Sequence, residues 1–286
     1  PEGRPPLARW IEPVADQDQR DFRVAVSPIS AADELRESLW ERCAGALITS
    51  ATLTSLGRFD RLLGKLGLDE ERAVCHRLPS PFDYGRAALC LPGSDFPDPR
   101  DAEAHTRAVA GLLAHHLDPA QGSLVLFTSR RHMEAAYAQL PPEWQGRTRC
   151  QGTVSRERLL AEHEAEIEAG RGSVLFGLAS FAEGVDLPGA LCRHVVIVRL
   201  PFSVPTTPVE ATTHEWVESR GGKPFFEISL PDASLRLIQA VGRLIRNEDD
   251  WGTVTILDPR VTTKPYGREL LDSLPPIPRQ TLQPPS

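Results

Sequence analysis

The chain alternates short apolar runs with longer amphipathic stretches over most of its length. Apolar runs that predict buried strands lie at 87–91, 123–128, 173–178, 194–200 and 253–257. Amphipathic stretches that predict helices lie at 102–117, 131–140, 155–169 and 233–247. This order of strands and helices predicts a mostly parallel sheet covered on both faces, and therefore an α/β fold.

The N-terminal part has a weaker pattern. Residues 1–29 are rich in proline and charge and contain a β-like run at 22–26. Ser30, followed by Asp33, predicts a capping box that opens a helix to about Arg42. A short buried strand is then predicted at Ala44–Ile48, because the run is continuously apolar.

A stiff proline-containing linker suggests where the domains divide. After a predicted helix over 56–66, residues 78–84 contain two prolines, and we place the boundary near residue 80. Residues 1–80 then form one part and residues 81–277 form the main α/β domain. The proline-rich tail, 278–286, is expected to be disordered.

Composition limits the classes of function. With 41% hydrophobic and 25% charged residues, the chain can bury one or two cores. The net charge is −7, so any contact with nucleic acid has to be local. Five cysteines without a Cys-x-x-Cys pair argue against a metal site and fit a reducing compartment. No membrane-length apolar run or signal peptide is visible, so we expect a cytoplasmic protein.

The segment Ser234–Arg246 carries the most informative polar pattern. Read as a helix, it places Gln239, Gly242, Arg243 and Arg246 on one face, and its leucines, isoleucines and valine on the other. Glycine at 242 allows a ligand to approach the backbone closely. Two guanidinium groups side by side suit a polyphosphate, because arginine stays charged and binds oxygens bidentately. The pattern alone fits a solvated basic helix end equally well.

Residues 239–246 resemble the last helicase motif of superfamily-two helicases, in the form used by the DinG and XPD branch. In that family the two arginines reach the γ-phosphate of ATP from the second motor domain. The resemblance implies catalytic roles for Gln239, Arg243 and Arg246, in a RecA-like domain that contacts nucleotide near Gly242.

A strand followed by hydroxyls and cations gives a second motif. Thr128, Ser129, Arg130 and Arg131 follow the predicted strand at 123–128. Ligands collect beyond the carboxyl ends of strands in open α/β sheets, and these groups suit phosphodiester oxygens. Thr128 or Ser129 serving as a helix N-cap is an equally good interpretation, and it is compatible with DNA contact. The segment resembles the family's fourth motif, which implies that Thr128, Ser129 and Arg130 bind single-stranded DNA.

The loop after the predicted strand at 173–178 is a third motif. It has glycines at 184 and 189 and carboxylates at 183 and 186. A carboxylate beside arginines can orient them or bind a ribose hydroxyl, although such a loop alone is more often a turn. The stretch 180–186 resembles the family's fifth motif. That implies a role for Gly184 and Asp186 in coupling the nucleotide to the DNA strand.

The stretch 49–53 resembles the third motif, which joins hydrolysis to movement in the first motor domain. By itself this stretch would pass as a strand-to-turn junction. Its place before the other motifs follows the family order, and the likeness extends over residues 8–277. The resemblance implies a coupling role for Ser50 and Thr52, and it makes residues 1–80 the C-terminal remnant of a first motor domain.

Two elements that such a helicase needs are missing from the chain. A phosphate-binding loop requires Gly-x-x-x-x-Gly-Lys-Ser/Thr, but Leu66 follows Gly64 and Lys65, and Phe59 stands where the first glycine belongs. No acidic strand end for Mg²⁺ is found, and the family's iron–sulfur cysteines are absent. We therefore expect Pro1 to mark a cut late in the first motor domain, and the isolated chain to lack meaningful ATPase or unwinding activity.

For the complete protein the resemblance implies ATP-driven 5′ to 3′ movement along single-stranded DNA, in DNA repair. ATP and Mg²⁺ would be bound jointly with the missing motor domain, where a 4Fe–4S cluster is also allowed. Forks or R-loops are allowed as substrates, and we expect a monomer with no membrane partner and no metal ligand in this chain. The alternative is a noncatalytic RecA-like module that binds nucleic acid or protein. The acidic charge favours that alternative, whereas the filled polar motif positions oppose it.

Overall fold

The computed structural model describes residues 4–15, 20–178, 181 and 184–282. The chain forms two compact units. Unit 1 comprises Pro1–Leu78 and Phe202–Ala233, and unit 2 comprises Pro79–Pro201 and Ser234–Ser286. Each unit is described by itself below.

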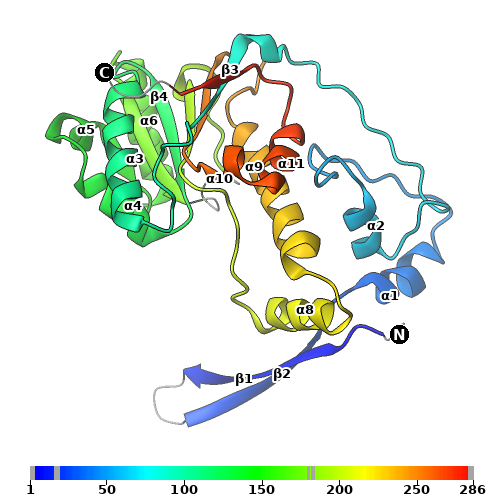
Figure 1. The fold of residues 1–286 in the computed structure, drawn as a ribbon. Coiled ribbons are helices and arrows are strands. Elements are labelled where there is room, and N and C mark those ends of the chain that lie inside the picture. The colour runs from blue at the N-terminus through cyan, green and yellow to red at the C-terminus, as the bar shows by residue number, and fades with distance from the viewer. Residues whose placement is uncertain (1–3, 16–19, 179–180, 182–183, 283–286) are drawn as a thin grey trace. The chain divides into compact units, whose positions relative to one another are not determined.

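Unit 2 is built around a sheet of seven parallel strands within the described residues (Figure 1). The order across the sheet is β5-β6-β4-β7-β8-β3-β9. The strands are β3 (Ala87–Leu91), β4 (Gly122–Phe127), β5 (Thr148–Cys150), β6 (Ser173–Leu178), β7 (His194–Ile197), β8 (Gly252–Ile256) and β9 (Arg279–Thr281). The predicted RecA-like α/β fold is confirmed for this unit.

Helices flank this sheet because each carries one apolar stripe that must be buried. They are α3 (Ala102–His116), α4 (Arg130–Ala138), α5 (Pro142–Arg147), α6 (Arg156–Glu168), α9 (Leu230–Val241), α10 (Arg260–Thr263) and α11 (Pro265–Asp272), and α9 belongs to this unit from Ser234 onward. Val109 of α3 and Met133 of α4 pack with Val125 and Phe127 of β4 in one buried cluster. Every residue of β4 is buried, as expected for a central parallel strand.

The C-terminal tail differs from the expectation of disorder. Residues 279–281 form β9, which pairs in parallel with β3, and Ile277 is 4% exposed. The sheet edge offered by β3 supplies backbone partners that the composition of the tail does not reveal. The remaining residues of the predicted tail, 283–286, lie outside the described residues.

The helix expected over 233–247 is shifted toward the N-terminus. It runs from Leu230 to Val241, and Gly242 to Leu244 form a turn. The N–H of Arg243 bonds to Ala240 O at 3.2 Å, one residue closer than in an α-helix. Glycine at 242 weakens the helix, and the last turn tightens. Arg243 and Arg246 therefore follow the helix and do not share its face with Gln239.

Unit 1 holds the remaining elements. They are β1 (Leu7–Ala15), β2 (Arg20–Pro28), α1 (Ala32–Leu35), a π-helical turn (Arg36–Trp40), α2 (Asp60–Leu66), α8 (Pro208–Ser219) and a second π-helical turn (Phe225–Ser229). β1 and β2 form an antiparallel hairpin in which Ile11 lies opposite Val24. Arg61 of α2 forms an ion pair with Asp232 at 2.6 Å and so joins the two stretches of chain in this unit.

Two predictions in unit 1 were wrong. Ala44–Ile48 is not a strand, and Leu47 is 90% exposed. A parallel strand needs a hydrogen-bonded neighbour, and the only strands described in unit 1 pair with each other. The capping box at Ser30 is also not formed: α1 has no side-chain cap, and Ser30 Oγ instead accepts a bond from Ala32 N–H at 3.2 Å.

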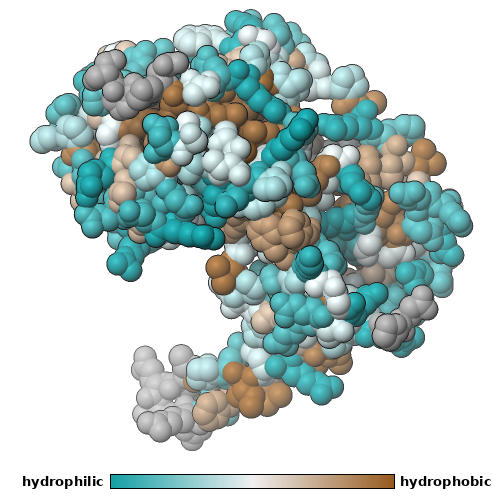
Figure 2. All heavy atoms as spheres, viewed as in Figure 1, coloured by the Kyte–Doolittle hydropathy of each residue, from teal (hydrophilic) through white to brown (hydrophobic). Residues whose placement is uncertain are grey.

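The hairpin β1–β2 presents an apolar outer face (Figure 2). Brown side chains gather along it beside the grey tip. The exposed apolar residues of this face are Leu7, Ile11, Phe22, Val24 and Val26, which are 48–72% exposed. Their cross-strand register places them on the same side of the hairpin. Contiguous exposed apolar surface of this kind is uncommon on monomeric soluble proteins.

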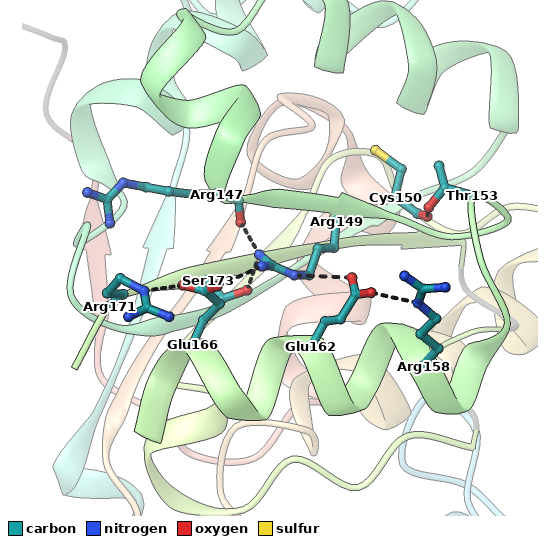
Figure 3. A network of polar contacts seen from close by, with 9 residues as sticks. All are labelled: Arg147, Arg149, Cys150, Thr153, Arg158, Glu162, Glu166, Arg171 and Ser173. Carbon is teal, nitrogen blue, oxygen red and sulfur yellow. Dashed lines mark hydrogen bonds and ion pairs between the residues drawn. The ribbon is translucent and has the colours of Figure 1, made fainter. Parts of the chain in front are cut away.

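A polar network holds edge strand β5 in unit 2 (Figure 3). Arg149 of β5 lies 3.3 Å from Glu166 and 3.8 Å from Glu162, both on α6, and bonds to Ser173 Oγ at 3.1 Å. The Arg149 side chain is only 18% exposed. Burial and several acceptors make this cluster stronger than an isolated surface ion pair.

Candidate nucleotide and nucleic-acid site

The predicted motif residues of unit 2 gather around the carboxyl ends of its central strands. β4, β6 and β7 are neighbours and run in the same direction. The segments that follow them therefore emerge at one edge of the sheet. The loop after β6 and the turn after α9 also meet directly, as the following contacts establish.

The two arginines after α9 both contact the loop that follows β6. Arg246 Nη2 lies 2.8 Å from Asp186 Oδ1, and Arg243 Nη1 donates to Val185 O at 2.8 Å. The Arg246 side chain is 34% exposed and that of Asp186 is 71% exposed, so water reaches this ion pair. Residues far apart in sequence are thus brought together.

A residue that the sequence pattern did not single out connects the same two segments. Asp250 is 3% exposed and follows the arginine turn. Its Oδ2 accepts bonds from the N–H groups of Arg246 and Asn247, both at 2.8 Å. Its Oδ1 accepts from Gly189 N–H, in the loop after β6, at 3.1 Å. An acidic residue just after the polar motif was the only sequence signal available.

Glycines shape the loop after β6. Gly184 is exposed, and a Cβ atom there would lie 2.5 Å from Arg156 Nη2, so the glycine leaves room for that guanidinium. Arg156, at the start of α6, also stacks over the ring of Phe181 at 5.4 Å. Arg156 was not predicted, because nothing in the sequence links α6 to this loop.

The other predicted nucleotide contacts lie nearby in sequence. Gln239 is half-buried on α9, and Gly242 is exposed at the end of that helix. A Cβ atom on Gly242 would lie only 3.2 Å from Ile238 O, so the glycine avoids a close contact at this exposed position. Ser180 and Glu183, which belong to the fifth motif, lie outside the described residues.

The segment after β4 combines a helix cap with exposed polar groups. Ser129 is the N-cap of α4 and accepts a bond from His132 N–H at 3.3 Å. Thr128, Ser129 and Arg130 are all exposed. The Arg130 guanidinium lies over Gly152, where a Cβ atom would be 2.8 Å from Nη1. The capping bond uses Ser129 Oγ as an acceptor and leaves the side chains of Thr128 and Arg130 available to a ligand.

The predicted coupling residues belong to unit 1. Ser50 Oγ accepts a bond from Thr52 N–H at 3.3 Å, so the two side chains sit in a local turn. Ser50 is exposed and Thr52 is half-buried.

The described part of the chain contains no group of three or more His, Cys, Asp or Glu side chains that could hold a metal ion. None of the described helices is long and apolar enough to cross a membrane.

Comparison with curated proteins gives long alignments. The chain is 43% identical to the ATP-dependent DNA helicase DinG of Photobacterium profundum over 283 residues, which covers 96% of this chain and 40% of that protein. It is 36% identical to DinG and 34% identical to the DNA helicase YoaA, both of Escherichia coli. Those two alignments cover 96% of this chain and 39% and 42% of the respective relatives. The chain thus spans about two fifths of the length of these relatives.

Solved structures support the fold. A structure of an XPD helicase matches with a TM-score of 0.62 at 18% identity, over 91% of this chain and 46% of that chain. A structure of XPD without ligand matches with a TM-score of 0.53 at 21% identity, over 68% of this chain and 40% of that chain. Residues 114–277 match the helicase C-terminal domain family. The chain therefore belongs to the helicase C-terminal domain family, in its DinG-like form.

Proposed function

We propose that the chain is the C-terminal motor part of an ATP-dependent DNA helicase that moves 5′ to 3′ on single-stranded DNA. Unit 2 would be the second motor domain. The observation that carries this proposal is the meeting of Arg243 and Arg246 with the loop Val185–Asp186.

Arg243 and Arg246 are the residues that would reach the γ-phosphate of ATP. A half-exposed ion pair such as that of Arg246 with Asp186 is worth only about 0–1 kcal/mol. A γ-phosphate carries more charge and offers a guanidinium several acceptor oxygens. It can therefore displace Asp186 from Arg246. Gln239 and the exposed Gly242 would complete this side of the nucleotide site.

The loop after β6 would carry the signal from the nucleotide to the DNA. Release of Asp186 from Arg246 would change the electrostatic environment of the loop after β6, in which Gly184 and Asp186 both lie. That loop leaves the sheet one strand away from the segment Thr128–Arg130. Closing on ATP and opening after hydrolysis would then shift the contacts with DNA alternately.

The described segment after β4 would bind phosphates and not read bases. Thr128 and Ser129 offer hydroxyl groups, and Arg130 a guanidinium, at an exposed strand end. Such groups position a nucleic acid strand without sequence preference. Forked DNA or R-loops are compatible with this mode of binding.

Unit 1 would belong to a first motor domain that is completed by other parts of a longer protein. The exposed apolar face of β1–β2 and the exposed Leu47 are expected where sheet and core partners lie elsewhere. ATP and Mg²⁺ would be bound jointly with that domain, which would also hold any 4Fe–4S cluster. Ser50 and Thr52 would couple hydrolysis to movement. We propose a cytoplasmic monomer that acts in DNA repair.

The double variant Arg243→Ala with Arg246→Ala tests the nucleotide role in the full-length protein. ATP binding should survive while DNA-stimulated hydrolysis falls by about 10³-fold or more, the range measured for arginine fingers. Arg268→Ala is a matched control, since that arginine is 89% exposed on α11. Unchanged turnover in the double variant would refute the role.

The isolated chain provides a second test. It supplies arginines but no phosphate-binding loop, so ATP turnover and unwinding should stay at background. Turnover above background that disappears in Arg246→Ala would show that this part of the proposal is wrong.

A further inference from the structure

Three neighbouring strands of unit 2 end in one row of polar residues. In the parallel register, Ile197 of β7 pairs with Leu126 of β4 and with Ile256 of β8. Two residues further along each chain, the same register leads to Thr128, Arg199 and Asp258. Backbone bonds continue the pairing beyond the strands, because Val198 N–H donates to Leu126 O at 3.0 Å and Leu257 N–H donates to Ile197 O at 2.9 Å.

Asp258 attracts Arg199 electrostatically, but its oxygens already accept hydrogen bonds from other donors and none from Arg199. Asp258 is fully buried, and its carboxylate accepts bonds from Arg260 Nε at 2.9 Å and Arg260 Nη2 at 2.6 Å. It also accepts from Leu200 N–H at 2.9 Å. The pKa of Arg260 is raised by these contacts. The carboxylate thus has a full set of donors.

Arg199 itself has no hydrogen bond or ion pair within the described residues. It is half-buried, and its Nε–H is buried without an acceptor. Burial lowers the pKa of Arg199, although a guanidinium remains charged at neutral pH. A partly desolvated cation with an unsatisfied donor is costly, so this position favours an anionic ligand.

The side chains beside Arg199 do not supply that anion. His105 of α3 and His132 of α4 lie with their rings 5.4 Å apart, and both are buried. Burial, together with the nearby charges of Arg199 and His105, lowers the pKa of His132 to about 4. Both ring nitrogens of His132 are buried without a partner. The other charged groups near Arg199 are Arg260, which is paired, and the exposed Asp98.

We propose that Arg199 binds a phosphodiester group of the same single strand that Thr128 and Arg130 contact. This inference rests on the proposed function and adds a binding residue to its DNA site. Adjacent strands lie about 4.8 Å apart, so Thr128 and Arg199 can contact one phosphate or successive phosphates. A guanidinium fork donates two parallel bonds to phosphate oxygens, which its position in the row permits.

Binding of a fluorescein-labelled oligothymidylate to the 286-residue chain tests the assignment. Fluorescence anisotropy is recorded at several salt concentrations for the wild type and for Arg199→Ala, Arg199→Lys and Arg268→Ala. Arg199→Ala should weaken binding about tenfold and lower the slope of log K against log salt by about 0.7. Arg199→Lys keeps the charge and should restore the slope but only part of the affinity. Arg268→Ala should match the wild type.

The outcomes separate this inference from the function on which it rests. If Thr128→Ala and Arg130→Ala bind the oligonucleotide like the wild type while Arg199→Ala does not, the proposed DNA contacts of Thr128 and Arg130 are wrong. The assignment of Arg199 to DNA binding then stands. Wild-type affinity and slope in Arg199→Ala refute the assignment and leave the proposed function intact. If the wild-type chain does not bind the oligonucleotide at all, both are overturned. If circular dichroism shows that Arg199→Ala does not fold, Arg199→Lys decides the question. A wild-type salt slope with reduced affinity in Arg199→Lys supports the assignment, and wild-type affinity refutes it.

Discussion

Replacing Asp250 with asparagine should separate the loop after β6 from the arginine turn. The carboxylate accepts three backbone N–H bonds: Oδ2 takes those of Arg246 and Asn247, and Oδ1 takes that of Gly189. An asparagine of the same shape keeps one oxygen. If that oxygen takes the place of Oδ2, it still accepts from Arg246 and Asn247 N–H. The NH₂ group then takes the place of Oδ1 and faces Gly189 N–H, so two donors oppose each other and no hydrogen bond forms.

The size of the effect follows from the number of bonds lost. A hydrogen bond to a charged acceptor contributes about 1.5–3 kcal/mol when its donor is otherwise unsatisfied. Asp250→Asn loses one such bond and also the charge that faces Arg193 Nη1 at 3.7 Å, so it should lower the free energy of unfolding by at least about 2 kcal/mol. Asp250→Ala loses three. Water can reach the partly exposed turn and replace some of them, so about 3–5 kcal/mol is expected for Asp250→Ala.

Urea denaturation and amide hydrogen exchange measure the two consequences. The Gly189 amide should exchange faster in Asp250→Asn, while the amides of Arg246 and Asn247 keep most of their protection. Asp249→Asn is the matched control, because Asp249 is adjacent and fully exposed. It should stay within about 0.5 kcal/mol of the wild type. Wild-type stability together with wild-type exchange at Gly189 in Asp250→Asn would refute the linking role.

Two further predictions concern the stability of unit 2. Arg149→Met should lower the free energy of unfolding, measured in urea, by about 1–3 kcal/mol, because the Arg149 side chain is 18% exposed and bonds to several acceptors. The Arg158 side chain is 70% exposed and pairs with one of the same α6 carboxylates, so Arg158→Met should lower the free energy of unfolding by less than about 0.5 kcal/mol. His132 should make stability fall with acid. Its pKa of about 4 in the folded protein lies below the unfolded value of about 6.5, so the unfolded chain takes the proton first. The contribution of His132 to the free energy of unfolding is therefore complete above pH 6.5 and is lost as the pH falls toward 4. The loss should reach about 2–3 kcal/mol at pH 4.5, and His132→Phe should remove this part of the pH dependence.

The controls for these two predictions use the same unfolding assay. Equal losses in Arg149→Met and Arg158→Met would mean that burial does not strengthen the Arg149 network. For the histidine, His115→Gln changes an exposed ring on α3 and should keep the wild-type pH dependence. A His132→Phe variant whose stability falls with acid as steeply as that of the wild type would contradict the assignment to His132.

Local sequence pattern was sufficient for much of unit 2. The apolar runs at β4 and β6 are continuous because both faces of these strands are buried, so they are recognisable without any knowledge of their neighbours. The N-cap of α4 at Ser129 depends on residues adjacent in sequence and was also among the expected possibilities. Periodicity and capping are local properties, which one sequence displays directly.

Contacts between distant segments were decided only by the tertiary structure. Ala44–Ile48 has the composition of a strand but no strand beside it within the described part of unit 1, because a strand depends on a hydrogen-bonded partner. The helix before Arg243 ends at Val241, and the two arginines reach the loop after β6 from a turn. Asp250 joins the distant Gly189 to the turn after α9, and Arg199 is left without a hydrogen-bond partner among the described residues, and neither fact can be read from spacing along the chain. Sequence thus determined the central strands and flanking helices of unit 2, while long-range hydrogen bonding and burial determined the remaining elements and which charged groups meet.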